Sequence, residues 1–379
     1  MAWGANPANN SIMGLRALFS RWQGSERLEQ VRSALRQQLE SPNTEVRMLA
    51  SNTVGRLFDP VEAEQQLSER LQTESTPEVQ EALLGALLDL SAVDPVAADR
   101  VLQNLSGVDC IASVNYRPDE ETSDLTRADG RLTRTLLCVF TRLALWVSTP
   151  FAAEAWAEWA SHPFEAPATV RSLVQFSREA MKPRSHEPDD PQLRAFTFVS
   201  ELTERVLGLL AVPAEDAIDE SDSSGRAVAI HVAHSIAIEL YFASGAFTNN
   251  VPPDEELSRI PEPSFVALAL PVLERLAAVG DVSTAHQVVQ TLVFLSRAKP
   301  RRALMSITDA ALGAPGYEQE PQGEEAMFKL FDQILADDQD NLLNDDEYLT
   351  RVRLVLERYV DLASTAAISQ IQRLSQSFR

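Results

Sequence analysis

The side chains best suited to metal chemistry are His231 and His234, which lie three residues apart in one predicted helix. That spacing puts two imidazoles on one face, and a zinc site needs at least a third ligand. The nearest acid, Glu239, lies away from that face, and His286 has no partner nearby in the sequence. The helix is apolar nearly all round, which favours buried, hydrogen-bonded core histidines. We therefore predict no metal ligand, cofactor or catalytic residue, and keep a metal-dependent enzyme using His231 and His234 as an alternative.

One compact basic cluster surrounds Pro300, and it consists of Arg297, Lys299, Arg301 and Arg302. Four cations at this spacing could hold a phosphate or an acidic peptide. Clusters of this kind also cap helix C-termini or pair with nearby acids. Because no aromatic residue interleaves with these cations, base stacking is unsupported. We keep the four residues as candidates for partner binding.

Aromatic and acidic residues supply two further candidate binding surfaces. Trp156 and Trp159 lie three apart and face one way on a predicted helix, which is typical of core packing or, if partly exposed, of a binding hot spot. From Glu318 to Glu347 there are eleven acidic residues and one base. This stretch is either a solvated surface or a docking surface for a basic partner. Its central acids are Asp337, Asp338 and Asp340.

The motifs of common enzymes are absent. The sequence contains no GxxxxGK[ST], GxGxxG, GxSxG or HExxH, which removes the usual nucleotide, dinucleotide, hydrolase and zinc-protease signatures. Two cysteines without a CxxC support neither a zinc knuckle nor a disulfide framework. The chain is therefore expected to be no enzyme.

The charge of the chain restricts its partners. The 379 residues include 55 acidic and 33 basic side chains, for a net charge of −22. A nucleic acid would be repelled by the molecule as a whole, so a nucleic-acid-binding protein stays a disfavoured alternative. No signal peptide or run of 18 apolar residues is present. We expect a cytoplasmic, bacterial protein with a protein partner, possibly a basic one, and no membrane contact.

A pattern that occurs twice organises the first hundred residues. Ser41-Pro42 and Thr76-Pro77 each open a segment, and Asp59-Pro60-Val61 and Asp94-Pro95-Val96 close these segments 18 positions later. The pattern therefore recurs at 35 residues, which is typical of stacked helical repeats. Ser, Thr and Asp are good N-caps, and proline suits the first helical position. Glu62, three residues after Asp59, predicts a capping box.

This pattern carries a family resemblance. The stretch Pro-Asn-Thr-Glu-Val-Arg-x-x-Ala-x-x-x-Val-Gly-x-Leu, residues 42–57, resembles the second helix of a HEAT repeat, and Pro77 to Leu87 is a looser copy. The resemblance covers about residues 25–105 and brings no catalytic residues. It implies a scaffold that binds other macromolecules on a curved helical surface.

Helical patterns continue beyond residue 105 without the strict period. We predict an all-α fold: an α-solenoid of HEAT-like helix pairs, with an irregular helical array in the C-terminal two-thirds. The expected parts are a flexible N-terminus (1–10), HEAT-like repeats (11–112), a polar loop (113–130) and the irregular array (131–379). The leading hypothesis is a non-enzymatic interaction scaffold or adaptor. A second is a regulatory or sensor subunit, or the C-terminal part, of a larger bacterial machine whose NTPase lies elsewhere.

Overall fold

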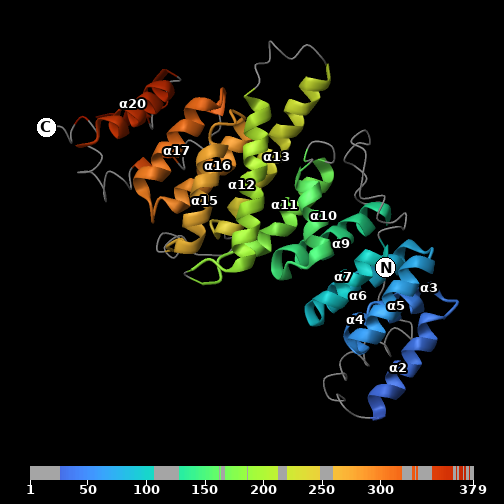
Figure 1. The fold of residues 1–379 in the computed structure, drawn as a ribbon. Helices are drawn as coiled ribbons and strands as arrows, with labels where there is room; N and C mark the ends of the chain where they lie inside the picture. Colours follow the sequence, from blue (N-terminus) through green and yellow to red (C-terminus); the bar gives the residue numbers. More distant parts are fainter. Residues whose placement is uncertain are drawn as a thin grey trace. The chain divides into compact units, whose positions relative to one another are not determined.

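The fold was obtained as a computed structural model of the whole chain (Figure 1). It describes residues 26–105, 128–161, 163, 167–185, 187–211, 220–247, 259–317, 327–328, 330–331, 344–361 and some positions between 364 and 375. All the regular elements in these residues are helices, so the predicted all-α class is confirmed. The predicted N-terminus 1–10 and the acids Asp337, Asp338 and Asp340 lie outside the described residues.

The chain divides into two compact units, residues 1–173 and 174–379. The first unit contains α2 (Glu26–Leu39), α3 (Thr44–Ser51), α4 (Val54–Leu57), α5 (Pro60–Thr73), α6 (Pro77–Val93), α7 (Pro95–Leu105), α9 (Ala128–Arg142), the π-helix η2 (Leu143–Val147) and α10 (Pro150–Ser161). The division falls within α11 (Pro167–Met181). The sequence predicts a polar loop over 113–130 and a helical array from residue 131. Helix α9 begins at Ala128, three residues earlier.

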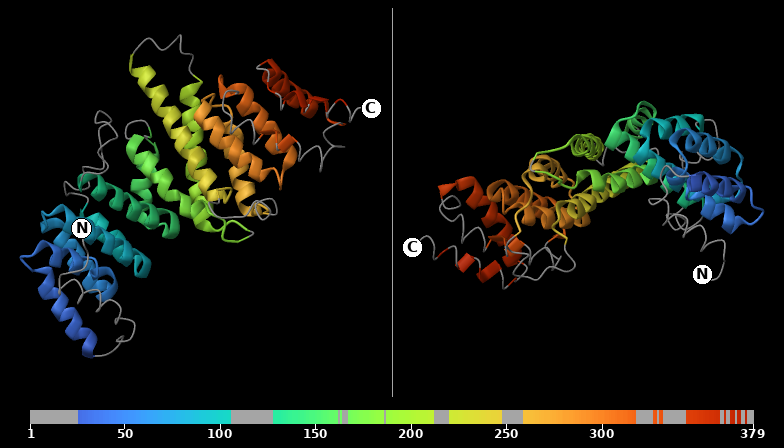
Figure 2. Two further views of the ribbon diagram at one scale, coloured as in Figure 1. Left: turned by 180° about the vertical axis from the view of Figure 1, so that it is seen from behind. Right: turned by 90° about the horizontal axis from the view of Figure 1, so that it is seen from below.

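The helices of the first unit form two layers. One layer contains α5, α7 and α10, in that order, and the other contains α3 with α4, then α6, then α9 with η2. Ion pairs and hydrogen bonds place α2 beside α5 in the first layer. Each helix also packs against its neighbour in sequence, as α5 does on α6 and α6 on α7. Figures 1 and 2 show these helices side by side.

Short polar residues and prolines set where these helices begin. Asp59 and Asp94 each accept a hydrogen bond from the backbone N–H three residues on, at 3.1 and 3.0 Å, as an N-cap should. The first repeat segment differs from the prediction, because α3 starts at Thr44 and its cap is Asn43, whose Oδ1 accepts from two N–H groups. The predicted start at Ser41-Pro42 is therefore wrong by two residues.

Two other capping predictions are corrected. Thr76 is the N-cap residue of α6, yet its side chain makes no capping bond. The hydroxyl of Thr76 instead accepts from the guanidinium of Arg47, at 3.1 Å. The carboxylate of Glu62 pairs with Arg36, so the side chain that would complete the capping box with Asp59 binds another helix. In both cases the side chain binds a residue of another helix instead of capping its own helix.

The predicted helix 42–57 is broken at Asn52 and Thr53 into α3 and α4. At the break, the hydroxyl of Thr53 donates to the carbonyl of Ala50, at 2.7 Å. This break lets α4 approach α6 closely at Gly55. A Cβ on Gly55 would lie 2.9 Å from the backbone nitrogen of Leu90 and closer still to the carbonyl oxygen of Ala86. Only glycine leaves room for this contact between helices.

The second unit contains α12 (Asp190–Leu210), α13 (Glu220–Ser244), α15 (Pro263–Leu276), α16 (Val282–Leu295), α17 (Pro300–Gly313) and α20 (Asp346–Asp361). α12 packs against α13 and α15, and α13 packs against α16. Further along, α16 packs against α17, and α17 packs against α20. Phe196 of α12 meets Phe265 of α15 edge to face, with ring centroids 5.6 Å apart. Helix pairs thus continue through this unit.

Helix α13 is strongly apolar over most of its length. Its segment Gly225–Ser244 passes the length and composition test for a membrane span, and so does the bent pair Arg131–Val147 and Pro150–Ser161 taken together. Half of the Gly225–Ser244 segment is buried against other helices. Core helices of this kind pass the same test, so the expected absence of a membrane partner stays a prediction.

Candidate protein-binding edge

Three tight connections in the first unit share one design. They are α4 to α5, α6 to α7 and η2 to α10, and we call them corners. Each corner has only one or two residues between its helices, and each following helix starts with proline. The local sequences are Phe58-Asp59-Pro60-Val61, Val93-Asp94-Pro95-Val96 and Ser148-Thr149-Pro150-Phe151. A polar cap followed by proline ends one helix and starts the next with little backbone between them.

The first two corners lie at the same end of the unit because α5 and α7 run parallel. Arg100 of α7 donates two hydrogen bonds to the carboxylate of Glu64 in α5, at 2.8 and 2.6 Å. Eight residues further along α5, Gln72 donates to the carbonyl of Asn104 near the end of α7. These two links occur in the same order on both helices. The starts of α5 and α7 are therefore neighbours.

Asp99 joins the third corner to the second. This buried carboxylate on α7 accepts from the hydroxyl of Thr149 at 2.8 Å and from the N–H groups of Phe151 and Ala152 at 3.1 and 3.0 Å. An aspartate from a neighbouring helix thus caps α10 and holds its start about one turn from Val96. The approach uses the π-helix η2 and then Ser148, the only described non-glycine residue with a positive φ, 61°.

The three corners expose a row of apolar side chains, which we call the corner row. Its exposed fractions are Val61 76%, Val93 65%, Val96 55%, Val147 43% and Trp146 39%. These are five of the ten large apolar side chains that are exposed in the described residues. The other five belong to the second unit. Single exposed apolar residues are ordinary, but a group on neighbouring corners at one edge is typical of an interaction surface.

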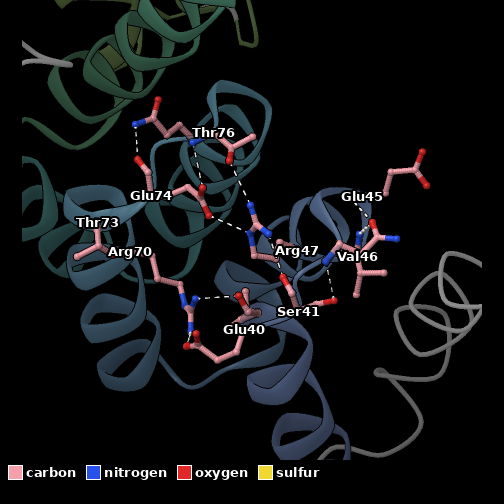
Figure 3. Close-up of polar contacts among 12 residues, drawn as sticks. Glu40, Ser41, Glu45, Val46, Arg47, Arg70, Thr73, Glu74 and Thr76 are labelled. Atoms are coloured by element: carbon pink, nitrogen blue, oxygen red, sulfur yellow. Dashed lines mark hydrogen bonds and ion pairs between the residues drawn. The ribbon is translucent and has the colours of Figure 1, made fainter.

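The opposite ends of the same helices are polar (Figure 3). Arg70, near the end of α5, binds the carbonyl of Leu39 and the carboxylate of Glu40 at the end of α2. Arg47 in α3 binds the carbonyl of Ser41, the carboxylate of Glu74 and the hydroxyl of Thr76. We call this side of the unit the polar edge and the other side the corner edge. The polar edge is satisfied internally, whereas the corner edge presents apolar groups to solvent.

Acidic side chains outnumber basic ones in the segment that contains the first two corners. Residues 26–105 contain fourteen acidic and seven basic side chains, and 7 − 14 gives a net charge of −7. Six of the seven arginines pair with acids of the same unit, as Arg36 does with Glu62 and Arg56 with Asp89. These ion pairs lie at the surface and add little stability. The excess of acidic over basic side chains leaves the segment with a negative net charge.

The basic cluster around Pro300 is largely neutralised within the second unit. Arg302 holds both carboxylate oxygens of Glu274, at 2.9 and 2.8 Å, and Arg301 pairs with Asp345 at the start of α20. The N–H of Tyr348 and then Arg301 lower the pKa of Asp345, and the hydrogen bond to Glu274 raises the pKa of Arg302. The cluster therefore ties α17 to its neighbours.

The remaining two cations of that cluster take different positions. Arg297 donates to the carbonyl of Arg259 at 2.9 Å, and its guanidinium lies 5.4 Å from the ring centre of Phe294. Lys299 is exposed at the start of α17 and its side chain has no polar partner in the described part of the chain. The four residues thus do not converge on one anion site.

Of the two alternatives for Trp156 and Trp159, the structure favours core packing. Trp156 is buried, and half-buried Trp159 meets Phe140 edge to face, with ring centroids 5.0 Å apart. Trp159 therefore packs α10 against α9. Trp146, which precedes the third corner, is the exposed one. The partner-binding role considered for Trp156 and Trp159 passes more naturally to Trp146.

The two histidines of α13 do not share one environment. His231 is exposed, and His234 is half-buried with its Nδ1 unbonded in the described residues. Burial lowers the pKa of His234, the charge of Asp281 opposes that effect, and both His231 and His286 add to the lowering. His286, which has no partner nearby in the sequence, is therefore brought near His234 by the packing of α16 on α13. No described group of three histidine, cysteine or acidic side chains is arranged to hold a metal.

Glu239 is a buried acid that the sequence did not single out as unusual. Burial raises its pKa to about 7, although Arg178 lies 3.3 Å from Oε2 and lowers it. That contact lacks hydrogen-bond geometry, so Oε2 is buried without a hydrogen bond in the described residues. Arg178 also lies over the ring of Phe242, at 5.5 Å.

Sequence reasoning also missed the third corner. Thr149-Pro150 follows Asp94-Pro95 by 55 residues instead of 35, because residues 106–127 separate α7 from α9. The signal was present in the cap and proline themselves. A polar cap followed by proline predicts this corner without any fixed period.

Comparison of the chain with protein-family models, curated proteins and solved structures gives no match.

Proposed function

We propose that this chain is a non-enzymatic scaffold that binds a protein partner on the corner edge of its first unit. The observation that carries the proposal is the corner row, five exposed apolar side chains at three alternate connections of the first unit. In this proposal the two-layered helix pairs are a HEAT-like solenoid, and the later pairs extend it. Surfaces of stacked pairs suit extended partners, because each pair adds one more contact in a row.

The charges support a protein partner over a nucleic acid. The chain carries −22 overall, and the arginines that could contact phosphate are mostly engaged by acids. Apolar side chains at the centre of a contact with charge around them are the usual anatomy of a protein interface. A polyanion would gain nothing from the exposed valines and would be repelled by the surplus acid.

The test is photo-crosslinking in the cells that make the protein. A photoreactive residue at Val96 should capture one defined protein, and the same residue at Leu193, an equally apolar exposed position in the second unit, should not. The double variant Val61→Ser/Val93→Ser should reduce the capture. Equal capture from both positions, or no effect of the double variant, would overturn the proposal.

A further inference from the structure

Few backbone hydrogen-bond donors at the corners are available to an extended peptide. Each corner helix begins with proline, which has no N–H. The carboxylates of Asp59, Asp94 and Asp99 already accept the N–H groups that follow. A strand that binds by backbone hydrogen bonds needs free donors and acceptors. The corner edge therefore suits an occupant whose own backbone is already satisfied, which is a helix.

The spacing of the corners suits a helix laid across them. Packed helices lie about 8–10 Å apart, so the starts of α5, α7 and α10 recur at about that distance. Seven residues of an α-helix rise about 10.5 Å. A helix that crosses the corners would thus present one side chain to each corner if its apolar residues lie seven apart. About fifteen residues reach all three corners.

The charge determines what flanks the apolar stripe of such a helix. The segment that forms the first two corners carries a net −7, and its arginines are paired. Asp59 is half exposed next to Val61, and Asp94 separates Val93 from Val96. Lysine and arginine beside the apolar stripe would therefore be attracted, and a second copy of this acidic surface would be repelled.

We infer that the occupant of the corner row is an amphipathic α-helix of a partner protein, with apolar residues seven apart and lysine or arginine beside them. The inference rests on the proposed function and specifies its partner. Val61 and the pair Val93 and Val96 would receive two successive apolar side chains. Trp146 with Val147 would receive the third.

The experiment is a selection from a displayed library of random peptides about 21 residues long, with the full chain as bait. Peptides are kept if they bind the natural protein and Leu193→Ser but not Val61→Ser/Val96→Ser. Leu193 is an exposed apolar residue of the second unit, so it controls for general stickiness. The selected peptides should be helical when bound and carry apolar residues seven apart among basic ones. Added salt should weaken their binding to the natural protein, because it screens the attraction between basic residues and the acidic surface.

Three results would overturn the inference. They are selected peptides without the sevenfold spacing, peptides that bind in an extended form, and failure to recover any peptide sensitive to the double variant. The first two leave the proposed function standing if photo-crosslinking at Val96 still captures a protein. Loss of that capture would instead remove the proposed function itself.

Discussion

At Gly55 the backbones of α4 and α6 are in close contact. The carbonyl of Ala86 and the amide of Leu90 occupy the space that a side chain would need. We predict that Gly55→Ala lowers the free energy of unfolding by about 1–3 kcal/mol, because the backbone of α4 or α6 must move. Urea unfolding followed by tryptophan fluorescence measures the change.

Gly85→Ala is the matched control, since a Cβ there would meet only the side chain of Asn52 at 3.5 Å. Within α6 this change should stabilise the helix by about 0.5–1 kcal/mol, because alanine restricts the unfolded chain more than glycine does. If both substitutions shift the midpoint equally, the close approach of α4 and α6 is not what glycine provides at position 55.

Glu239 makes stability depend on pH. Its pKa is raised from 4.5 to about 7 in the fold, so the folded protein binds more protons than the unfolded chain between those values. Stability from this group is therefore present below pH 4.5 and is lost as pH rises towards 7. The difference of 2.5 pH units corresponds to about 3 kcal/mol.

Glu239→Gln should remove that loss, since glutamine stays neutral. Relative to the natural protein, the variant should gain stability progressively from about pH 4.5 to 7, measured by urea unfolding and circular dichroism at a series of pH values. His234 acts in the opposite direction, because its lowered pKa adds stability as pH rises towards 6.5, and it does so in both proteins. A constant difference between the two proteins across this range would contradict the prediction.

At the scale of elements, Asp99 holds the start of α10 against α7. Replacing it by alanine would leave one hydroxyl and two N–H groups without their acceptor in a buried place. We predict a loss of about 2–4 kcal/mol for Asp99→Ala, and a smaller loss for Asp99→Asn, which keeps one acceptor oxygen. Thermal and urea unfolding provide the measurement.

Asp59→Ala is the corresponding control, because Asp59 caps its own helix at a half-exposed position. Its cost should be about 1 kcal/mol. Should Asp99→Ala prove no worse than Asp59→Ala, the cap from the neighbouring helix does not hold the third corner.

Local rules predicted much of this helical arrangement. Pro60, Pro77 and Pro95 each start a helix as expected, because proline fixes φ and lacks only a donor that the first turn does not use. The break between α3 and α4 escaped prediction since it depends on contact with α6. The third corner escaped prediction because it does not follow the period of 35 residues, and its bond to Asp99, 50 residues away from Thr149, cannot be read from the local sequence.

The candidate site was less predictable than the fold. The repeated Asp-Pro-Val triplet identifies Val61 and Val96 as equivalent positions. The neighbouring residues in the sequence do not predict whether these valines are buried or exposed. Exposure depends on which helix packs next to that position. The charged cluster around Pro300 shows the reverse case, because its arginines stand together in sequence and find separate acids in the fold.

At the scale of the whole molecule, the two compact units should unfold as distinguishable steps. All five tryptophans of the chain lie at or before position 159, within the first unit, whereas helices of both units contribute to circular dichroism. We therefore expect tryptophan fluorescence to report only the first unit. Gly55→Ala should shift the fluorescence transition and only part of the dichroism transition, and Glu239→Gln should leave the fluorescence transition unchanged.

The decisive comparison is between the two probes on the same urea series. Transitions that coincide in the natural protein and in both variants would mean that the chain unfolds as one cooperative block.

The connections of the first unit differ in length according to the side on which they lie. On the corner edge they contain two, one and two residues, whereas the connections 40–43 and 74–76 on the polar edge contain four and three. A change in the length of a polar-edge connection would therefore leave the spacing of the corner row unchanged. A labelling domain inserted between Leu105 and Ala128 is therefore expected to leave partner binding at the corner row unchanged.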